Sequence, residues 1–169
     1  MFQAGKVNQV AKEMKRSRLA ILGVSETRWT GAGKVHLTTE EMVLYSGLAG
    51  DDVPHEKGEA LILSKEAGKS LKEWEPIYER IIFAKFESKC QNTTIIQVYA
   101  PTNDAEEVVK ENFYQQLQSA YSMKKAVVLT MVTVDLNAKV GADNRNWEAS
   151  MGTHGDGVIN ENGEMFCDF

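Results

Sequence analysis

Two acidic side chains stand where an apolar run gives way to polar residues, and both can hold a cation or act on a phosphate. Glu26 follows the apolar run Leu19–Val24, and Asp135 follows Ala126–Val134. Each run predicts a buried strand, which places a carboxylate at the carboxyl end of a strand. Ligands tend to bind at such ends in layered α/β folds. A charge there costs free energy unless a cation or hydrogen bonds compensate it, so both positions are candidates for a functional site.

Two further polar groups have a spacing that suits phosphate chemistry. Asn137 stands two residues after Asp135, and side chains two apart on an extended segment point to the same side, so amide and carboxylate can meet on one phosphate or water. Tyr99 stands two residues before Pro101, and its phenol can donate a hydrogen bond to a phosphate oxygen. The alternative is purely structural: a capping Glu, a turn-forming Asp/Asn pair and a Tyr at an ordinary strand end.

Composition limits the class of protein. The chain has 169 residues, 43% of them hydrophobic and 25% charged, which is typical of one soluble globular domain. A formal net charge of −5 argues against a basic DNA-binding module, although an acidic enzyme can act on DNA if its carboxylates hold a cation. Two cysteines without a CxxC pattern predict neither a disulfide framework nor a zinc site. Since no signal peptide and no membrane-spanning segment is recognisable, we expect an intracellular protein, either nuclear or cytoplasmic.

Hydrophobic periodicity predicts the elements that must position these side chains. Apolar residues at helical spacing indicate a helix over roughly the first sixteen residues: Val7, Val10, Ala11 and Met14. Short apolar or β-branched runs predict strands at residues 19–24, 42–45, 60–63, 77–86, 94–99 and 126–134. Gly-rich or polar stretches predict loops at residues 31–34 and 50–58 and a long excursion at 137–157.

Two later helices carry recognisable start signals. Asn103 and Glu106 have the spacing of a capping box, followed by one apolar face made of Val109, Phe113, Leu117 and Tyr121. Asn160 is predicted to cap a last helix whose core-facing side is formed by Phe166 and Phe169. The whole pattern is that of an α/β domain with one or two packed sheets, two or three helices and no internal repeat.

Six short motifs occur in a fixed order along the chain: Ser-Glu-Thr-Arg-Trp at 25–29, Gly-x-Ala-Leu-Ile-Leu-Ser at 58–64, Tyr-Ala-Pro-Thr-Asn-Asp at 99–104, Asp-Leu-Asn-Ala-Lys-Val-Gly at 135–141, Met-Gly-Thr-His-Gly-x-Gly at 151–157 and Asn-Glu-Asn-Gly-Glu at 160–164. Each alone is a weak signal. Together, in this order and spacing, they resemble the endonuclease domain of RTE-like non-LTR retrotransposons, of the endonuclease/exonuclease/phosphatase type. The resemblance covers essentially residues 1–169.

The resemblance implies a fold, a cofactor and roles for the candidate residues. The fold is a four-layer αββα sandwich of the DNase I-like type. Glu26 corresponds to the family's Mg²⁺ ligand, with Mn²⁺ as a substitute, and Tyr99 to its phosphate-contacting tyrosine. Asp135 corresponds to the residue that orients the attacking water or protonates the leaving oxygen. Asn137 corresponds to the amide that steadies the scissile phosphate, and Asn103 is a further expected substrate contact. The implied partner is DNA, bound through its phosphodiester backbone.

The chain also departs from the family pattern. The family's first strand, which carries a metal-site Asn, and its final Ser-Asp-His segment have no counterpart within residues 1–169, so we expect an incomplete domain. Val134 stands where the family has Gly, and Glu59 is unexpected in an apolar strand start. We therefore expect a metal-dependent DNA endonuclease domain with little or no activity in this form. The alternatives are an interaction protein that keeps the fold without the chemistry, and a phosphatase for small phosphoesters.

A geometric expectation follows from the same correspondence. Although they are far apart in the sequence, Glu26, Tyr99, Asp135 and Asn137 should converge on one cleft. The missing first strand and last segment should also leave an unpaired sheet edge with apolar side chains facing solvent.

Overall fold

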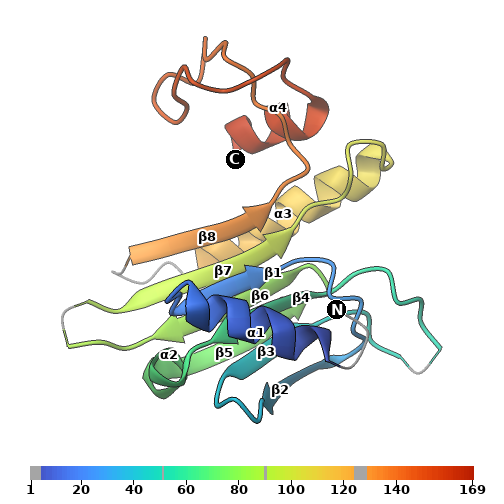
Figure 1. Ribbon diagram of the computed structural model, residues 1–169. Coiled ribbons are helices and arrows are strands. Elements are labelled where there is room, and N and C mark those ends of the chain that lie inside the picture. Colours follow the sequence, from blue (N-terminus) through green and yellow to red (C-terminus); the bar gives the residue numbers. More distant parts are fainter. Residues whose placement is uncertain (1–4, 51, 90, 124–128) are drawn as a thin grey trace. The chain divides into compact units, whose positions relative to one another are not determined.

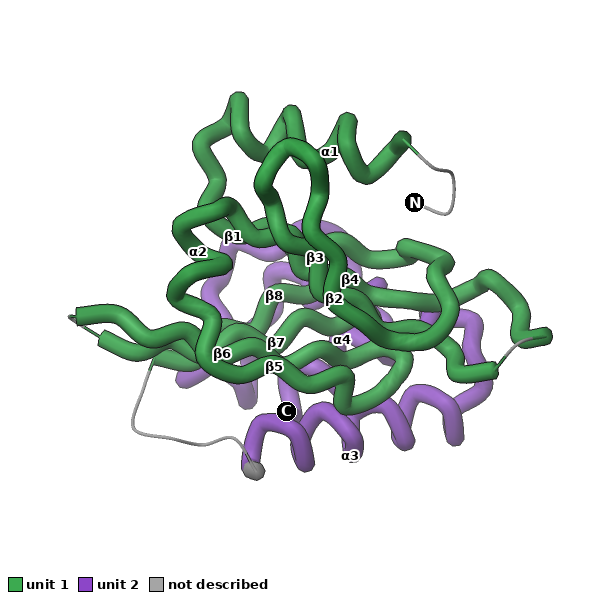
Figure 2. Tube along the Cα trace, turned by 90° about the horizontal axis from the view of Figure 1, so that it is seen from below, with its two compact units in different colours: residues 1–99, 124–134 green, residues 100–123, 135–169 purple. Residues whose placement is uncertain are grey.

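The computed structural model describes residues 5–50, 52–89, 91–123 and 129–169, and these fall into two compact units. The first unit runs through Tyr99 and resumes with the strand that reaches Val134. The second holds Ala100–Met123 and Asp135–Phe169. Figure 2 shows the two units in different colours.

The first sheet of unit 1 contains four antiparallel strands. They are β1 (Ile21–Val24), β2 (Ala32–His36), β3 (Met42–Ser46) and β4 (Glu59–Leu63), in the spatial order β1-β4-β3-β2. β4 is the most deeply buried of them, and all five of its residues are buried. Its central place between β1 and β3 explains this, because both edges of the strand are paired.

The second sheet has the order β5-β6-β7-β8 and packs face to face on the first. Its strands are β5 (Leu71–Tyr78), β6 (Ile81–Phe86), β7 (Thr93–Tyr99) and β8 (Leu129–Asp135). The core between the sheets combines side chains of β3 and β4 with side chains of β6 and β7: Leu44, Leu61, Leu63, Ile82, Ala84, Phe86 and Ile95. This apolar layer is the main source of stability for unit 1.

Two helices complete unit 1. Helix α1 (Lys6–Arg16) covers the outer face of the first sheet, where Met14 packs on Val43, Ala60 and Ile62 (Figure 1). This confirms the amphipathic helix predicted from the first sixteen residues. Helix α2 (Lys65–Ser70) was not predicted, because it is only six residues long. Its start is nevertheless well defined, since the Ser64 hydroxyl accepts a hydrogen bond from the Ala67 amide at 3.1 Å.

Unit 2 consists of helices α3 (Glu107–Met123) and α4 (Glu161–Asp168) and an irregular stretch that precedes α4. Helix α4 and its cap are as predicted. The Asn160 side-chain oxygen accepts a hydrogen bond from the Gly163 amide at 2.9 Å. No helix among the described residues is long and apolar enough to cross a membrane.

One predicted strand was wrong in extent, and one predicted loop is part of a strand. Residues 77–86 do not form one strand: a turn at Glu79 and Arg80 separates β5 from β6. Pro76 argues against a strand over 71–78, but β5 is an edge strand with register shifts, where a missing amide is tolerated. Residues 31–34 were predicted to be a loop, yet β2 starts at Ala32. Its largely exposed residues form a strand because β3 offers a free edge, which local propensity cannot reveal.

The strands at 19–24 and 126–134 were predicted to be buried, and this was wrong. β1 is an edge strand whose four residues are only half-buried. β8 is also an edge strand, with Leu129, Met131 and Val134 each more than 40% exposed. That this exposure results from a missing first strand or last segment stays a prediction. Residues 126–128 of the predicted strand lie outside the described residues.

Three details of the helices also differ from prediction. Helix α3 starts at Glu107 without the capping box, because a turn with Ala105 N–H on the Thr102 carbonyl intervenes after Asn103. On its predicted apolar face Val109 is 41% exposed, whereas Phe113 and Leu117 are buried as expected. Phe166 of α4 and Phe169, the residue after the helix, are each 37% exposed and are not core residues. The side of α4 that is buried instead presents Asn162 and Gly163.

A close approach between the sheets requires glycine at position 23. A Cβ added to Gly23 would lie 1.9 Å from Oε1 of Gln97. We expect Gly23→Ala to lower the free energy of unfolding by about 1–3 kcal/mol, because Gln97 must leave its hydrogen bonds to make room. Urea unfolding measures the loss. Gly152→Ala is the matched control, since nothing lies within 4 Å of its Cβ position. Equal stability of the two variants would refute this packing.

Candidate functional site

The predicted metal ligand and the predicted phosphate-contacting tyrosine are hydrogen-bonded to each other. The Tyr99 hydroxyl donates to Glu26 Oε1 at 2.6 Å, although the two residues are 73 positions apart. Tyr99 is 6% exposed, whereas the Glu26 side chain is 49% exposed. A buried phenol thus holds one oxygen of a carboxylate that otherwise faces solvent. Both residues were predicted to belong to the site, and the structure brings them together.

Two arginines flank this pair. The Arg80 guanidinium lies over the Tyr99 ring at 5.0 Å from its centroid and donates to the Tyr99 carbonyl at 3.1 Å. These contacts fix the ring from its face and from its backbone. Arg28 Nη2 lies 3.8 Å from Glu26 Oε2 in an exposed pair, which contributes little to stability. The Arg28 side chain is therefore available for a phosphate at the cost of a weak interaction.

The backbone that carries Glu26 has an unusual conformation. Glu26 and Arg28 have φ values of 53° and 59°, in the left-handed region that side chains other than glycine seldom adopt. Between them Thr27 is fully buried, and its amide donates to the Gly58 carbonyl at 2.9 Å. Strained residues of this kind persist only when their surroundings fix them, and they often mark functional sites.

A buried network of four polar side chains, the Glu59 network, lies next to the strand ends that carry the candidate residues. Glu59 Oε2 accepts from the Ser25 hydroxyl at 3.1 Å and from Gln97 Nε2 at 2.8 Å. Thr133 in turn donates to Gln97 Oε1 at 2.7 Å. Ser25 is adjacent to Glu26 in the chain, and Gln97 is two residues before Tyr99. Glu59 is unexpected in an apolar strand start, and its partners Ser25 and Gln97 are too distant in the sequence to be predicted from it.

In unit 2, Asp135 and Asn137 form a local turn. The Asn137 amide N–H donates to Asp135 Oδ1 at 3.3 Å, and Asn137 Nδ2 donates to the Ala100 carbonyl at 3.0 Å. Asn137 also has a positive φ, 48°. This is the geometry of the turn-forming pair considered as the structural alternative. It leaves Asp135 exposed, with a carboxylate that is open to solvent.

Asn162 holds the segment around Asn137 in place and was missed by sequence reasoning. It is fully buried, and its Nδ2 donates to the carbonyls of Pro101 at 2.8 Å, Leu136 at 3.3 Å and Asn137 at 3.4 Å. One amide group therefore ties the start of α4 to the two loops that carry the predicted contacts. The signal was available in the Asn-Glu-Asn-Gly-Glu motif, where only the first Asn had been given a role.

Asn103, predicted to bind substrate, is engaged with the two helices of unit 2. Its Oδ1 accepts from the Asn162 amide at 3.4 Å, and its carbonyl accepts from Lys110 Nζ at 3.2 Å. Lys110 is 2% exposed and pairs with Glu161. Asn103 thus has a clear structural role, and its contact with a substrate stays a prediction.

The donor set suits one loosely held divalent cation. Among the described residues no group of three or more His, Cys, Asp or Glu side chains could hold a metal ion. Glu26 still offers a solvent-facing carboxylate, and Mg²⁺ is often bound through one or two carboxylates together with waters and substrate phosphates. Glu26 and Tyr99 belong to unit 1, and Asp135 and Asn137 to unit 2. That all four line one cleft stays a prediction.

Comparison with known proteins supplies relatives for this geometry. No family model matches the chain. Craniofacial development protein 2 of Bos taurus and of Tragulus javanicus are each 34% identical to it over 165 residues, or 98% of the chain. The chain spans only about a quarter of the length of these relatives, 27% and 28%. It is a distant homologue of craniofacial development protein 2.

Two solved structures share the arrangement of the strands. The endonuclease domain of TRAS1, a telomere-specific non-LTR retrotransposon, matches 98% of the chain with a TM-score of 0.61 and 14% identity, and 64% of that domain is covered. An endonuclease/exonuclease/phosphatase family protein from Leptotrichia buccalis matches 82% with a TM-score of 0.56 and 10% identity, and 63% of it is covered. The fold is that of an endonuclease/exonuclease/phosphatase domain. At these identities the likeness establishes the fold alone, and it confirms the predicted DNase I-like architecture of two packed sheets.

The Glu59 network predicts an unequal response to two substitutions. Glu59→Ala leaves Gln97 and Ser25 without their acceptor, and we expect a loss of about 1–3 kcal/mol in the free energy of unfolding. Glu59→Gln keeps the size and one carbonyl oxygen, so it should lose less. Urea unfolding of both, with the exposed Glu111→Gln as control, measures the difference. If Glu59→Ala were as stable as the control, the network would not hold the strand ends.

We expect the buried Tyr114 hydroxyl to lose its proton only at a pH well above that of an exposed tyrosine. Burial, assisted by the neighbouring Cys167, raises the pKa of Tyr114 to about 12 from its usual value of 10.0. Its hydroxyl donates to the Asn162 carbonyl at 2.9 Å. Because the folded pKa is raised, this stabilisation is fully present below pH 10 and is lost as the pH rises through about 12. The ultraviolet tyrosinate signal that disappears in Tyr114→Phe should titrate near 12, and a midpoint near 10 would contradict the burial.

Proposed function

We propose that this chain carries the residues of a metal-dependent site that cleaves phosphodiester bonds in DNA. The observation that carries the proposal is the 2.6 Å hydrogen bond from Tyr99 to Glu26. It joins the two side chains whose positions correspond to the metal ligand and the phosphate contact of the resembling endonucleases. A strained backbone at Glu26 and a buried network behind it support the same site.

The cation would be Mg²⁺ or Mn²⁺, held by the Glu26 carboxylate. Such an ion polarises a phosphoryl oxygen and stabilises the charge on the leaving oxygen. Tyr99 occupies Oε1 and so orients Oε2 outward, which makes the phenol a positioning group for the carboxylate. Arg28, whose exposed pairing with Glu26 is weak, can turn to a non-bridging phosphate oxygen.

The remaining roles fall to Asp135 and Asn137. The exposed Asp135 side chain can orient a water for in-line attack as a carboxylate, or it can give a proton to the leaving oxygen in its protonated carboxyl form. The Asn137 side-chain amide gives one of its two N–H groups to the Ala100 carbonyl, and it can donate the other to the scissile phosphate. Because one carboxylate leaves most of the metal's coordination to water, we expect slow cleavage.

Nicking of supercoiled plasmid DNA tests the proposal. With Mg²⁺ or Mn²⁺ the chain should nick slowly, and Glu26→Gln should reduce the rate at least about tenfold by removing the metal's anchor. Tyr99→Phe should reduce it less, because the carboxylate stays. Glu111→Gln, an exposed change on α3, is the control and should nick like the parent.

Each other outcome separates the alternatives. Nicking that is unchanged in Glu26→Gln would refute the assignment of this site. Release of inorganic phosphate from small phosphoesters, without nicking, would favour the phosphatase. No hydrolysis of either kind, together with no Mn²⁺ binding that depends on Glu26, would favour an interaction protein that retains only the fold.

A further inference from the structure

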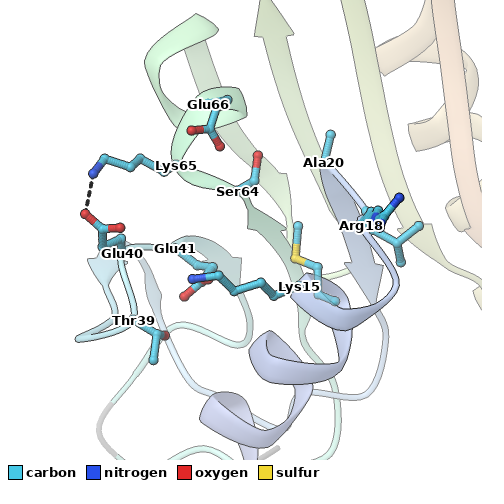
Figure 3. A pocket seen from close by; sticks show the side chains of 11 residues that line it. Lys15, Arg18, Ala20, Thr39, Glu40, Glu41, Ser64, Lys65 and Glu66 are labelled. Atoms are coloured by element: carbon cyan, nitrogen blue, oxygen red, sulfur yellow. Dashed lines mark hydrogen bonds and ion pairs between the residues drawn. The ribbon is translucent and has the colours of Figure 1, made fainter.

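Two cavities of unit 1 have similar volumes but different walls. One, of about 410 Å³, is lined mainly by polar and charged side chains, and two of these, Lys65 and Glu40, pair with each other (Figure 3). The other, the Trp29 pocket, has a volume of about 420 Å³ and mostly apolar walls. It lies on the outer face of the first sheet, where α1 packs, and its volume is typical of small-ligand pockets.

The walls of the Trp29 pocket suit a flat aromatic ring. Four aliphatic side chains and two aromatic rings line it: Val7, Val35, Leu37, Val43, Trp29 and Tyr45. The Trp29 and Tyr45 rings meet at 88° with centroids 5.2 Å apart, so each helps to hold the other in place. Thr30 and His55 also line the pocket and add side chains that form hydrogen bonds. A flat ring with polar edges, such as a nucleobase, matches this lining.

The backbone that carries Trp29 is fixed in the absence of a ligand. The Gly31 amide donates to the Leu48 carbonyl at 2.7 Å. Gly47 packs so closely that an added Cβ would lie 1.9 Å from the Trp29 carbonyl oxygen. Because the Trp29 ring is already half-buried and positioned, little conformational entropy is lost when a second ring stacks on it.

The pocket adjoins the segment that carries the proposed metal ligand. Trp29 follows Arg28 directly, and His55 Nδ1 lies 3.0 Å from the Arg28 carbonyl oxygen. Arg28 is the side chain that can turn to a phosphate, and its present partner is Glu26. The ring that would hold a base and the cation that would hold a phosphate are therefore neighbours in the chain.

The charges next to the pocket do not oppose a strand of phosphates. None of the described residues that line it is acidic. Three cations and one anion stand directly beside lining residues in the chain: Lys6, Arg28, Lys34 and Glu56. The chain as a whole carries −5, so this region is more favourable to an anionic ligand than the average of the chain.

We propose that the Trp29 pocket receives an unpaired base of the DNA strand that is bound at the Glu26 site. The base stacks on the Trp29 ring, and the aliphatic side chains of β2 and β3 exclude water from it. The preferred substrate is then DNA with a single-stranded or distorted stretch, because a base must leave its pair and its stack to enter a pocket. This inference rests on the proposed function for the identity of the strand, whereas the binding of the base needs no metal.

Two single strands of equal charge isolate the contribution of the bases: an octamer of thymidylate and an octamer of abasic tetrahydrofuran phosphates. Each carries a fluorescein, and its binding to the full chain is measured by fluorescence anisotropy in EDTA, where metal-dependent cleavage does not occur. We expect the thymidylate strand to bind at least about fivefold more tightly, because stacking on an aromatic ring adds to the phosphate contacts. Equal dissociation constants, or no binding of either strand, would overturn the proposal.

Val35→Asp tests the pocket with little effect on the core. Val35 is 45% exposed on an edge strand, so the fold should persist, whereas a carboxylate in the pocket should reduce the preference for thymidylate to less than about twofold. General repulsion weakens both strands alike and leaves their ratio unchanged. Val108→Asp, the same change at a 55% exposed position of α3, is the matched control and should keep the preference. A full preference in Val35→Asp would contradict the proposal.

Tryptophan emission locates the bound base among three tryptophans. An unlabelled thymidylate strand should quench the emission of the parent, and the abasic strand should not. Trp29→Phe keeps an aromatic ring but should lose this quenching, and quenching that persists in Trp29→Phe would overturn the placement of the base.

Glu26→Gln separates the pocket from the proposed metal site. It should keep the preference for thymidylate in EDTA while it loses most of the nicking. Nicking that depends on Glu26 without any preference for thymidylate would refute the pocket alone, and a preference without nicking in the parent would refute the metal site alone.

Discussion

Glu59 imposes a requirement on four strands at once, because a carboxylate buried between two sheets must find hydrogen-bond donors. It finds them in Ser25, next to β1, and in Gln97 of β7, and Gln97 is held in turn by Thr133 of β8. These hydrogen bonds can form only when the strand ends are in one register. Since Ser25 precedes Glu26 directly and Gln97 shares a strand face with Tyr99, the same hydrogen bonds fix the backbone beneath the candidate metal ligand.

The packing around the Glu59 network also involves Gly23, Gly58 and the left-handed backbone at Glu26. Gly23 leaves room for the Gln97 side chain, and a larger residue would displace it. At Gly58 the chain has a φ of 120°, and its carbonyl accepts the Thr27 amide, which helps to hold Glu26 in its left-handed conformation. The strained backbone at Glu26 therefore persists because buried residues around it, such as Thr27, fix its conformation. Loss of the hydrogen bond between Thr27 and Gly58 should displace the Glu26 carboxylate before it unfolds the sheets.

Local patterns predicted much of this structure, and the failures have identifiable causes. Apolar runs located β3, β4 and β7, and ordered motifs located Glu26 and Tyr99, because those signals lie within a few residues. The edge positions of β1 and β8 depend on which strands pair, and alternating hydrophobicity does not contain that information. Asn162 was missed because its role depends on hydrogen bonds to three backbone carbonyls that are distant from it in the sequence. The pairing of Glu59 with Gln97 was invisible for the same reason.

The central claim is that Glu26, held by the Tyr99 hydroxyl, is the residue that anchors a divalent cation. Paramagnetic broadening by Mn²⁺ in the NMR spectrum of the full chain tests it most directly. The account predicts that Mn²⁺ broadens the ring signals of Tyr99, that Glu26→Gln loses this effect, and that the exposed control Glu111→Gln keeps it. A Tyr99 ring that stays sharp in the parent, or that is broadened equally in Glu26→Gln, would contradict the claim.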